Sequence, residues 1–372
     1  MARICLNACS VYPGMTGIGQ YACSLVAALR STSGGHEYVV LRSPGHDALG
    51  DGFPANWCLV DIKGAEPMWE QLQLPGLLDE CEADLYHTAL LTTPIVRVCK
   101  SIITLHDVIP LAHPDLVPSS FRDLFHRWIG PSLRACDRVV TTSNAAKAEI
   151  VAHLDVEAER VAVVHQCVGH RFRPRRPDEL TSVLSRHGLE AGRYLLYVGA
   201  IDRRKNVERL LKAYAESKAL REFGVRLAVC GRSADGEYTL EVALSSAGAR
   251  LGICELGYVP DEDLAPIVAG ARALVFPSLA EGFGRPVLEA LASGVPVVAS
   301  GIAPLREVAG DAAEWVDAQD VESIAEGIRA VLSEDDDVRA TRRERGLARA
   351  KEFGPERFAS ETLAVYAQLL GG

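Results

Sequence analysis

The chain has 372 residues, 48% of them hydrophobic and 24% charged, with a formal net charge of −10 at neutral pH. This length exceeds the size at which a single hydrophobic core keeps growing, so two domains are expected. The acidic balance argues against non-specific nucleic-acid binding. The ten cysteines form no CxxC pair, which fits a reducing compartment. No apolar run approaches the roughly 20 residues of a membrane span.

The N-terminus begins with a strand-like segment and has no basic and apolar leader. We therefore expect a cytoplasmic protein without an integral membrane segment. Peripheral contact with the inner membrane face is left open.

The first half alternates short apolar runs with helical segments. A glycine-containing loop reaches Gly19, and an apolar-periodic helix is expected from about Tyr21 to Leu29. The runs are continuous and rich in Val, Ile or Leu, which is typical of parallel strands covered on both faces. The expected strands are 4–8, 38–41, 84–87, 101–105, 138–142 and 161–164.

The second half repeats this scheme. Strands are expected at 194–198, 226–230, 254–257, 273–276, 296–299 and 314–316, and helices at 206–219, 262–270, 286–293, 338–352 and 356–370. Strand–helix alternation in both halves predicts an α/β protein with two doubly wound parallel sheets. A segment rich in Arg and Pro, 172–178, marks the linker, with the boundary near residue 175.

The segment from Glu281 to Glu289 is the best indication of function. It reads EGFGRPVLE and follows a predicted strand. Its proline is typical of the first turn of a helix, and Gly294 is expected to end that helix in the left-handed conformation. Carboxylates accept hydrogen bonds from sugar hydroxyls, and amides at a helix N-terminus bind phosphate. The pattern therefore suits a polyhydroxylated, phosphorylated ligand, although Glu289 by itself would be an ordinary surface residue.

A basic loop follows the first predicted strand of the second half. It contains Arg203, Arg204 and Lys205 directly before the helix at Asn206. Arg binds a diphosphate as a planar fork and Lys binds it as a point charge. A solvated loop is the alternative. Its place at the carboxyl end of a strand, where α/β sheets bind ligands, favours a ligand.

Two weaker motifs lie in the first half. Gly14, Gly17 and Gly19 precede the first helix, but their spacing is not GxGxxG. His106 and Asp107 follow the strand ending at Leu105, where a histidine could bind a sugar or move a proton. A lone histidine is more often structural. The sequence has no metal-ligand spacing such as HExxH and no GxSxG nucleophile motif.

Together these motifs resemble those of the retaining family-4 glycosyltransferases of the GT-B fold, across essentially the whole chain. The matching pieces are Gly17–Gly19, Thr104–Asp107, Thr141–Asn144, Gly199–Asn206, Phe276–Ser278, Glu281–Glu289 and Gly294–Val298. The resemblance implies two Rossmann-like domains facing an interdomain cleft. Residues 1–175 would bind the acceptor and residues 176–354 the nucleotide sugar. A C-terminal helix, 355–372, would pack back on the N-terminal domain.

The resemblance also implies roles in holding a nucleotide-sugar donor. Glu289 would bind the ribose hydroxyls, Glu281 with the amides of Phe283 and Gly284 the donor sugar, and Arg204 and Lys205 the diphosphate. Gly17 and Gly19 would approach the phosphates, His106 the sugar, and the backbone at Tyr258 and Val259 the base, with Gly282 and Leu288 as further donor contacts. The catalytic set would be His106, Arg204, Lys205 and Glu281.

The implied reaction is metal-independent and needs no cofactor, because cations and helix dipoles stabilise the leaving diphosphate. No carboxylate is placed as a covalent nucleophile, so same-face displacement with retention is expected. Many relatives have a basic residue where this chain has Ala200, which leaves the diphosphate contacts to Arg204 and Lys205, with Arg203 as a further candidate. By analogy, the Arg-Lys-Asn form favours a mannose-type donor such as GDP-mannose.

The acceptor carries no signature. It would be a glycan, a lipid-linked sugar or a small molecule, as in polysaccharide biosynthesis, met by the loops 12–16, 66–77 and 111–125. Two alternatives remain. One is a GT-B enzyme of the sugar-phosphate-synthase type, and the other is a non-catalytic nucleotide-sugar-binding protein.

Overall fold

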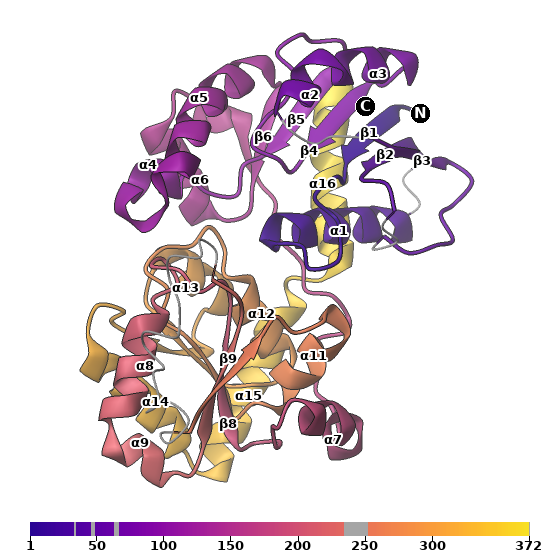
Figure 1. The fold of residues 1–372 in the computed structure, drawn as a ribbon. Coiled ribbons are helices and arrows are strands. Elements are labelled where there is room, and N and C mark those ends of the chain that lie inside the picture. Colours follow the sequence, from indigo (N-terminus) through magenta and orange to yellow (C-terminus); the bar gives the residue numbers. More distant parts are fainter. Residues whose placement is uncertain (33–34, 46–48, 63–66, 234–251, 372) are drawn as a thin grey trace. The chain divides into compact units, whose positions relative to one another are not determined.

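The protein is described by a computed structural model whose described residues are 1–32, 35–45, 49–62, 67–233 and 252–371 (Figure 1). It divides into two compact units. The N-terminal unit comprises Met1–Pro114, Ser119–Cys167 and Phe353–Gly372, and the C-terminal unit comprises Asp115–Pro118 and Val168–Glu352.

The N-terminal unit is built on a parallel sheet of seven strands in the order β3-β2-β1-β4-β5-β6-β7. The strands are β1 (Arg3–Asn7), β2 (Glu37–Arg42), β3 (Trp57–Asp61), β4 (Leu85–Thr88), β5 (Lys100–Thr104), β6 (Arg138–Thr141) and β7 (Val161–Val163). All except β3 were expected. The edge strand β3 is only partly buried, and its sequence WCLVD lacks the continuous aliphatic run by which buried strands are found.

Helices cover both faces of this sheet. Successive residues of β1 point to opposite faces, so Ile4 and Leu6 pack in one core and Cys5 in another. The helices of the unit are α1 (Gly17–Ser31), α2 (Pro67–Leu72), α3 (Leu74–Glu80), α4 (Ile109–Ala112), α5 (Ser119–Ala135), α6 (Asn144–His153) and α16 (Pro355–Leu370), with a 3₁₀ turn η2 (Ala158–Arg160). A further 3₁₀ turn, η1 (Pro114–Leu116), spans the boundary between Pro114 and the segment Asp115–Pro118.

The first helix begins earlier than the apolar period predicted. It starts at Gly17, after Thr16, and not at Tyr21, so Gly17 and Gly19 lie in its first turn. The prediction was wrong because glycines carry no apolar period. Gly19 packs so closely that a Cβ atom there would lie 2.2 Å from the Ser10 carbonyl oxygen, and this packing is invisible in the sequence.

The C-terminal helix belongs to the N-terminal unit, as predicted. In Figure 1 the yellow α16 lies beside α1. Phe358 and Tyr366 are buried in the core that α1 and β1 share. The Tyr366 hydroxyl and His87 Nδ1 share a hydrogen bond of 2.6 Å, and His87 Nε2 lies 2.8 Å from Thr104 Oγ1. These buried polar contacts fix the helix against β4 and β5.

The C-terminal unit contains a parallel sheet of six strands in the order β10-β9-β8-β11-β12-β13. The strands are β8 (Tyr194–Val198), β9 (Arg226–Cys230), β10 (Ile253–Gly257), β11 (Ala273–Phe276), β12 (Val297–Ser300) and β13 (Ala313–Val316). All six were expected to within a residue. Fully buried aliphatic residues in β8, β9, β11 and β12 explain why the sequence revealed these four strands, whereas β10 and β13 are only partly buried.

The helices of this unit are α7 (Pro177–Arg186), α8 (Val207–Glu216), α9 (Lys218–Glu222), α11 (Asp261–Gly270), α12 (Arg285–Ala292), α13 (Ala303–Ala309), α14 (Val321–Leu332) and α15 (Asp336–Lys351). The prediction of a single helix over 206–219 is wrong. The segment forms two helices, because Ser217 leaves the helical conformation and its hydroxyl caps α9 by accepting from the Leu220 amide.

Candidate functional site

A buried ion cluster forms where β8 and β11 end. Lys205 Nζ donates to Glu281 Oε1 at 2.5 Å, and Arg204 Nη1 donates to Glu281 Oε2 at 3.2 Å. Lys205 and Glu281 are each only 8% exposed. The carboxyl ends of two parallel strands thus bring together residues that are 76 positions apart. One carboxylate fixes two cations, so these three predicted site residues form one structural group.

The charges in this cluster set the ionisation of its members. Burial alone would raise the pKa of the Glu281 carboxyl, but Lys205 and Arg204 outweigh it and leave that pKa below its ordinary value. Burial lowers the pKa of the Lys205 ammonium, and the Glu281 charge opposes this effect. Lys205 Nζ also lies 4.7 Å from the ring centroid of Phe276, a cation–π contact. Glu281 is therefore held as a carboxylate that orients both cations.

The loop carrying the cations is fixed by its neighbours. Asn206 adopts the left-handed conformation, with φ of 59°. Its side-chain amide donates to the carbonyls of Pro277 at 2.9 Å and Ala318 at 2.7 Å. Asp202 accepts from the Lys205 amide at 2.7 Å. A loop held at both sides presents Arg204 and Lys205 at little further cost in conformational entropy.

The glycine turn after Glu281 leads into α12. Gly284 has φ of 106°, and a Cβ atom there would lie 2.2 Å from Leu305 Cδ2, so only glycine suits this position. The helix begins at Arg285, with Pro286 as its second residue. Gly294 follows the helix with φ of 71°, as predicted. Gly282 and Gly284 therefore add no side chains to the turn that follows Glu281.

Glu289 lies one turn into α12 and is not the ordinary surface residue it would be by itself. It is 5% exposed, and Arg285 Nε donates to its Oε1 at 2.8 Å. Burial raises the pKa of the Glu289 carboxyl above its ordinary value, and the Arg285 charge only partly opposes this. Sequence reasoning missed Arg285, although its spacing of four residues from Glu289 on a helix is the usual spacing for an ion pair.

The other predicted donor residues of this unit differ in exposure. Leu288, Phe283 and Val259 are buried, so their side chains belong to the core. Tyr258 is 37% exposed, and the Arg232 guanidinium carbon lies 4.7 Å from its ring centroid. Gly282 is buried in the turn. Among these residues, Tyr258 is the one that offers a ring surface.

Three predicted site residues lie in the N-terminal unit. Gly17 and Gly19 form the first turn of α1. The His106 ring lies edge-on to Tyr21, with centroids 4.8 Å apart. Burial lowers the pKa of His106 to about 4, and a hydrogen bond to the Ala89 backbone opposes this only in part. His106 Nε2 is buried and finds no partner among the described residues. The ring is thus neutral near pH 7, with one nitrogen able to accept or donate.

Two of the three segments expected to meet an acceptor, 66–77 and 111–125, are largely helical where they are described, whereas 12–16 form a turn before α1. Residue 66 lies outside the described residues, and 67–77 contribute to α2 and α3. In α5, Phe125 is buried, whereas Phe121 and Leu124 are 45% and 41% exposed. Within the described part of the chain, no helix combines the length and apolar character needed to cross a bilayer.

Solved structures share this architecture over nearly all of the chain. Sucrose-phosphate synthase from Thermosynechococcus elongatus matches with a TM-score of 0.78 at 19% identity and covers 100% of both chains. HepE from Anabaena, solved with UDP and glucose, matches with a TM-score of 0.76 at 16% identity and covers 99% of this chain and 100% of its own. At these identities the likeness shows the fold alone. That fold is GT-B, the two-domain Rossmann-like architecture of one class of glycosyltransferases.

Sequence comparison adds the family. Residues 185–349 match Glycosyl transferases group 1, and residues 15–171 match Glycosyltransferase Family 4. O-antigen chain mannosyltransferase B of Escherichia coli is 34% identical over 275 residues, which are 73% of this chain and 71% of that protein. O-antigen chain mannosyltransferase RfbU of Salmonella typhimurium is 28% identical over 64% of this chain and 62% of its own. The serotype-specific mannosyltransferase WbdA of Escherichia coli matches over only 29% of its own length.

The chain belongs to the group 1 and family 4 glycosyltransferases. It is therefore an enzyme of the hexosyltransferase class, as the motifs predicted.

Proposed function

We propose that this enzyme transfers a mannosyl residue from GDP-mannose to a glycan acceptor, with retention of the anomeric configuration and without a metal ion. Two observations support the mannosyl donor. The relatives at 34% and 28% identity are mannosyltransferases, and the cationic loop has the Arg-Lys-Asn form. The proposed product is a growing polysaccharide chain.

The ion cluster at Glu281 carries this proposal. When the bond between the anomeric carbon and phosphate breaks, negative charge develops on the leaving diphosphate. Arg204 and Lys205, fixed by Glu281 in a buried setting, are suited to stabilise that charge, since preorganised cations in a low-dielectric site act more strongly than in water. In this proposal Glu281 orients the two cations and, with the glycine turn, contacts the donor sugar.

The remaining roles follow the same logic. Glu289, held by Arg285, binds the ribose hydroxyls, and the backbone near Tyr258 and Val259 meets the guanine base. Gly17 and Gly19 allow the first turn of α1 to approach the phosphates. His106 binds a donor hydroxyl through its unpartnered Nε2. A neutral imidazole can hydrogen-bond to a sugar hydroxyl, and this role requires no transfer of a proton to or from the ring.

A ligand panel tests the donor. Thermal shifts are measured for the full chain with UDP-, GDP- and ADP-sugars, for the wild type, Glu289→Ala and, as a matched control, the exposed helical variant Glu216→Ala. GDP-mannose should give the largest shift in the wild type and in Glu216→Ala, and a much smaller one in Glu289→Ala, because a ligand stabilises in proportion to its affinity. A larger shift with UDP- or ADP-sugars would refute the proposed base.

Product stereochemistry tests the reaction. NMR of the newly formed glycosidic linkage, with GDP-α-mannose as donor, should show the α configuration. A β-linked product would mean inversion and would overturn the proposed same-face displacement. Release of GDP with no acceptor present separates a slow enzyme from a protein that only binds the donor.

A further inference from the structure

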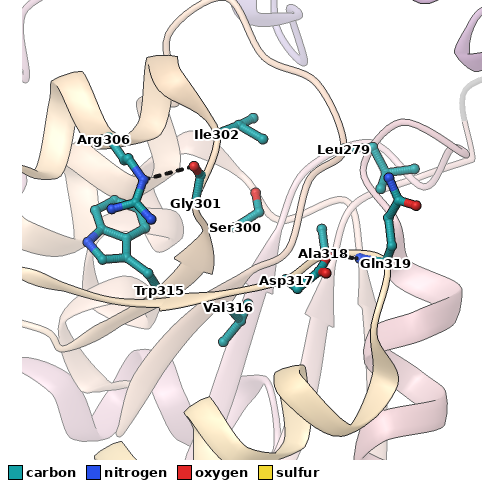
Figure 2. A pocket seen from close by; sticks show the side chains of 10 residues that line it. All are labelled: Leu279, Ser300, Gly301, Ile302, Arg306, Trp315, Val316, Asp317, Ala318 and Gln319. Atoms are coloured by element: carbon teal, nitrogen blue, oxygen red, sulfur yellow. Dashed lines mark hydrogen bonds between the residues drawn. The ribbon is translucent and has the colours of Figure 1, made fainter.

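A cavity of about 440 Å³ opens in the C-terminal unit, beside the carboxyl ends of β12 and β13 (Figure 2). Such a volume falls within the roughly 300–1,000 Å³ of small-molecule sites. None of the ten residues that line it belongs to the proposed donor site. The donor-binding roles therefore leave this cavity without an assignment.

The walls of the cavity combine an apolar side with a set of polar side chains. Leu279, Ile302 and Val316 supply the apolar side. Figure 2 shows the Arg306 guanidinium over the indole of Trp315. The guanidinium carbon lies 4.8 Å from the ring centroid, and Arg306 Nε donates to the Gly301 carbonyl at 2.9 Å. This packing fixes a flat, amphipathic surface.

Two further polar residues line the cavity next to β13. Asp317 Oδ1 accepts from the Gln319 backbone amide at 2.8 Å, which shapes the turn after the strand. The Gln319 side-chain amide makes no hydrogen bond within the described part of the chain, and neither does Trp315 Nε1. The cavity thus offers both donors and acceptors to a ligand.

The charge of the lining selects the kind of ligand. Arg306 and Asp317 are its one cation and its one anion, so the cavity is close to electrically neutral. Clustered cations make the strongest hydrogen bonds to phosphate groups, and this cavity offers a single Arg whose charge is balanced by Asp317. A neutral ligand with an apolar face and many hydroxyls fits better, because planar polar side chains bind hydroxyls while aliphatic and indole surfaces cover C–H groups. A hexose ring has this character.

The cavity is joined directly to the loops of the proposed donor site. The amide of Leu279 donates to the Arg204 carbonyl at 2.8 Å. Asn206, next to Lys205, donates to the carbonyl of the lining residue Ala318. The hydroxyl of the lining residue Ser300 donates to the Ser278 carbonyl at 2.5 Å. A saccharide in the cavity would therefore contact the same scaffold that holds the diphosphate cations.

We infer that this cavity is a saccharide subsite, in which a neutral hexose unit of the acceptor glycan, other than the reacting unit, is bound between Trp315, Arg306 and Gln319. The inference rests on the proposed function, because it takes the acceptor to be a glycan. It assigns the C-terminal unit a part in acceptor binding in addition to donor binding.

Direct binding tests the subsite without turnover. Linear mannotetraose is titrated into the full-length wild type, with saturation-transfer NMR as the readout and no donor present. Binding should weaken about fivefold in Gln319→Ala, the effect of one lost hydrogen bond, and further in Trp315→Leu. Asp311→Ala, an exposed residue before the other end of β13, is the matched control and should bind like the wild type. Absence of mannotetraose binding to the wild type, or equal binding by all variants, overturns the inference.

Kinetics separate this inference from the proposed function. With GDP-mannose, Gln319→Ala should raise KM for a long glycan acceptor while leaving kcat, KM for the donor and KM for a monosaccharide acceptor unchanged. If GDP-mannose supports no turnover but the variants still weaken mannotetraose binding, the donor proposal fails and the subsite stands. If turnover is normal and no variant changes KM for any acceptor, the subsite fails alone. Competition between GMP and mannotetraose that Gln319→Ala abolishes would instead assign the cavity to a nucleotide.

Discussion

The two Rossmann-like units share an architecture but use buried polar groups differently. In the C-terminal unit the buried charges form ion pairs at strand ends, Lys205 and Arg204 with Glu281 and Arg285 with Glu289. In the N-terminal unit the buried polar groups near the predicted site residues are neutral, as in the chain of His87, Thr104 and Tyr21. The same fold thus holds buried ion pairs in one unit and a neutral hydrogen-bonded chain in the other.

The difference follows from what each unit is proposed to do. Stabilising a leaving diphosphate requires cations that stay in place, and a buried carboxylate holds them there. The neutral chain of the N-terminal unit instead fastens α16 to the sheet through Tyr366. Buried ion pairs are weak sources of stability, because desolvation offsets their attraction. We therefore assign the charged pairs to function and the neutral chain to structure.

The largest effect is expected from a substitution in the ion cluster of the C-terminal unit. Lys205→Ala should lower kcat by roughly 10²–10³, the range for removing one preorganised group that stabilises transition-state charge. Lys212→Ala is the control, because this lysine on the neighbouring α8 has a side chain that is 57% exposed. Steady-state kinetics with saturating donor provide the measurement. Activity within threefold of the wild type in a folded Lys205→Ala protein would contradict the assigned role.

The second prediction concerns close backbone packing in the N-terminal unit. Gly19→Ala would place a Cβ atom 2.2 Å from the Ser10 carbonyl oxygen, whereas at Gly17 nothing lies within 4 Å. We expect Gly19→Ala to lower the free energy of unfolding by roughly 1–3 kcal/mol and Gly17→Ala to leave it nearly unchanged. Urea unfolding of both variants, followed by circular dichroism, compares them. Equal stabilities would show that α1 can shift to admit the extra methyl group.

The third prediction uses the pH dependence of stability to test whether His87, in the neutral hydrogen-bonded chain of the N-terminal unit, stays uncharged. Burial lowers the pKa of His87 to about 3, against an ordinary value of about 6.5 in the unfolded chain. Between these values the unfolded state binds the proton and the folded state does not, so stability is lost as pH falls below about 6.5. At pH 5 the part of this loss that His87 contributes should be about 2 kcal/mol relative to pH 7.

Urea unfolding of the N-terminal unit at both pH values, followed by hydrogen exchange of its amides, measures this loss. His87→Gln has no titrating ring, so its stability should fall by about 2 kcal/mol less over the same interval. Parallel pH profiles of the wild type and His87→Gln would show that His87 binds its proton in the folded state as well.

The last prediction is that removal of metal ions has no effect on activity. If Arg204 and Lys205 supply the positive charge for the leaving diphosphate, then prolonged dialysis against EDTA should leave kcat and both KM values unchanged. Activity is measured before and after dialysis, and again after addition of Mg²⁺ or Mn²⁺. A loss that either ion restores would mean that the cations of the C-terminal unit are insufficient alone.

The sequence predicted most strands of the two sheets because these strands are buried on both faces and therefore appear as continuous aliphatic runs. It also drew attention to the loops after β8 and β11, since loops between aliphatic runs stand out by their Gly, Arg and Glu residues. It missed β3, whose edge position leaves mixed exposure, and the start of α1, whose glycines have no apolar period.

Which residues share a site was decided by the tertiary structure. From the sequence, Lys205 was predicted to bind the diphosphate and Glu281 the donor sugar, and nothing linked the two residues. In the structure they form one buried ion pair. Glu289 read as a surface residue unless its neighbours were counted, and its burial beside Arg285 came only with the packed helix. The cavity beside Trp315 joins residues from three strand ends and leaves no local pattern.

The sequence by itself thus determined the class of fold, the family and the positions of the motifs, because these depend on local composition and on hydrophobic period. The tertiary structure alone decided charge pairing, burial and cavity shape. These quantities depend largely on distances between residues far apart in the chain, such as Lys205 and Glu281, which parallel strands ending at a common edge bring together.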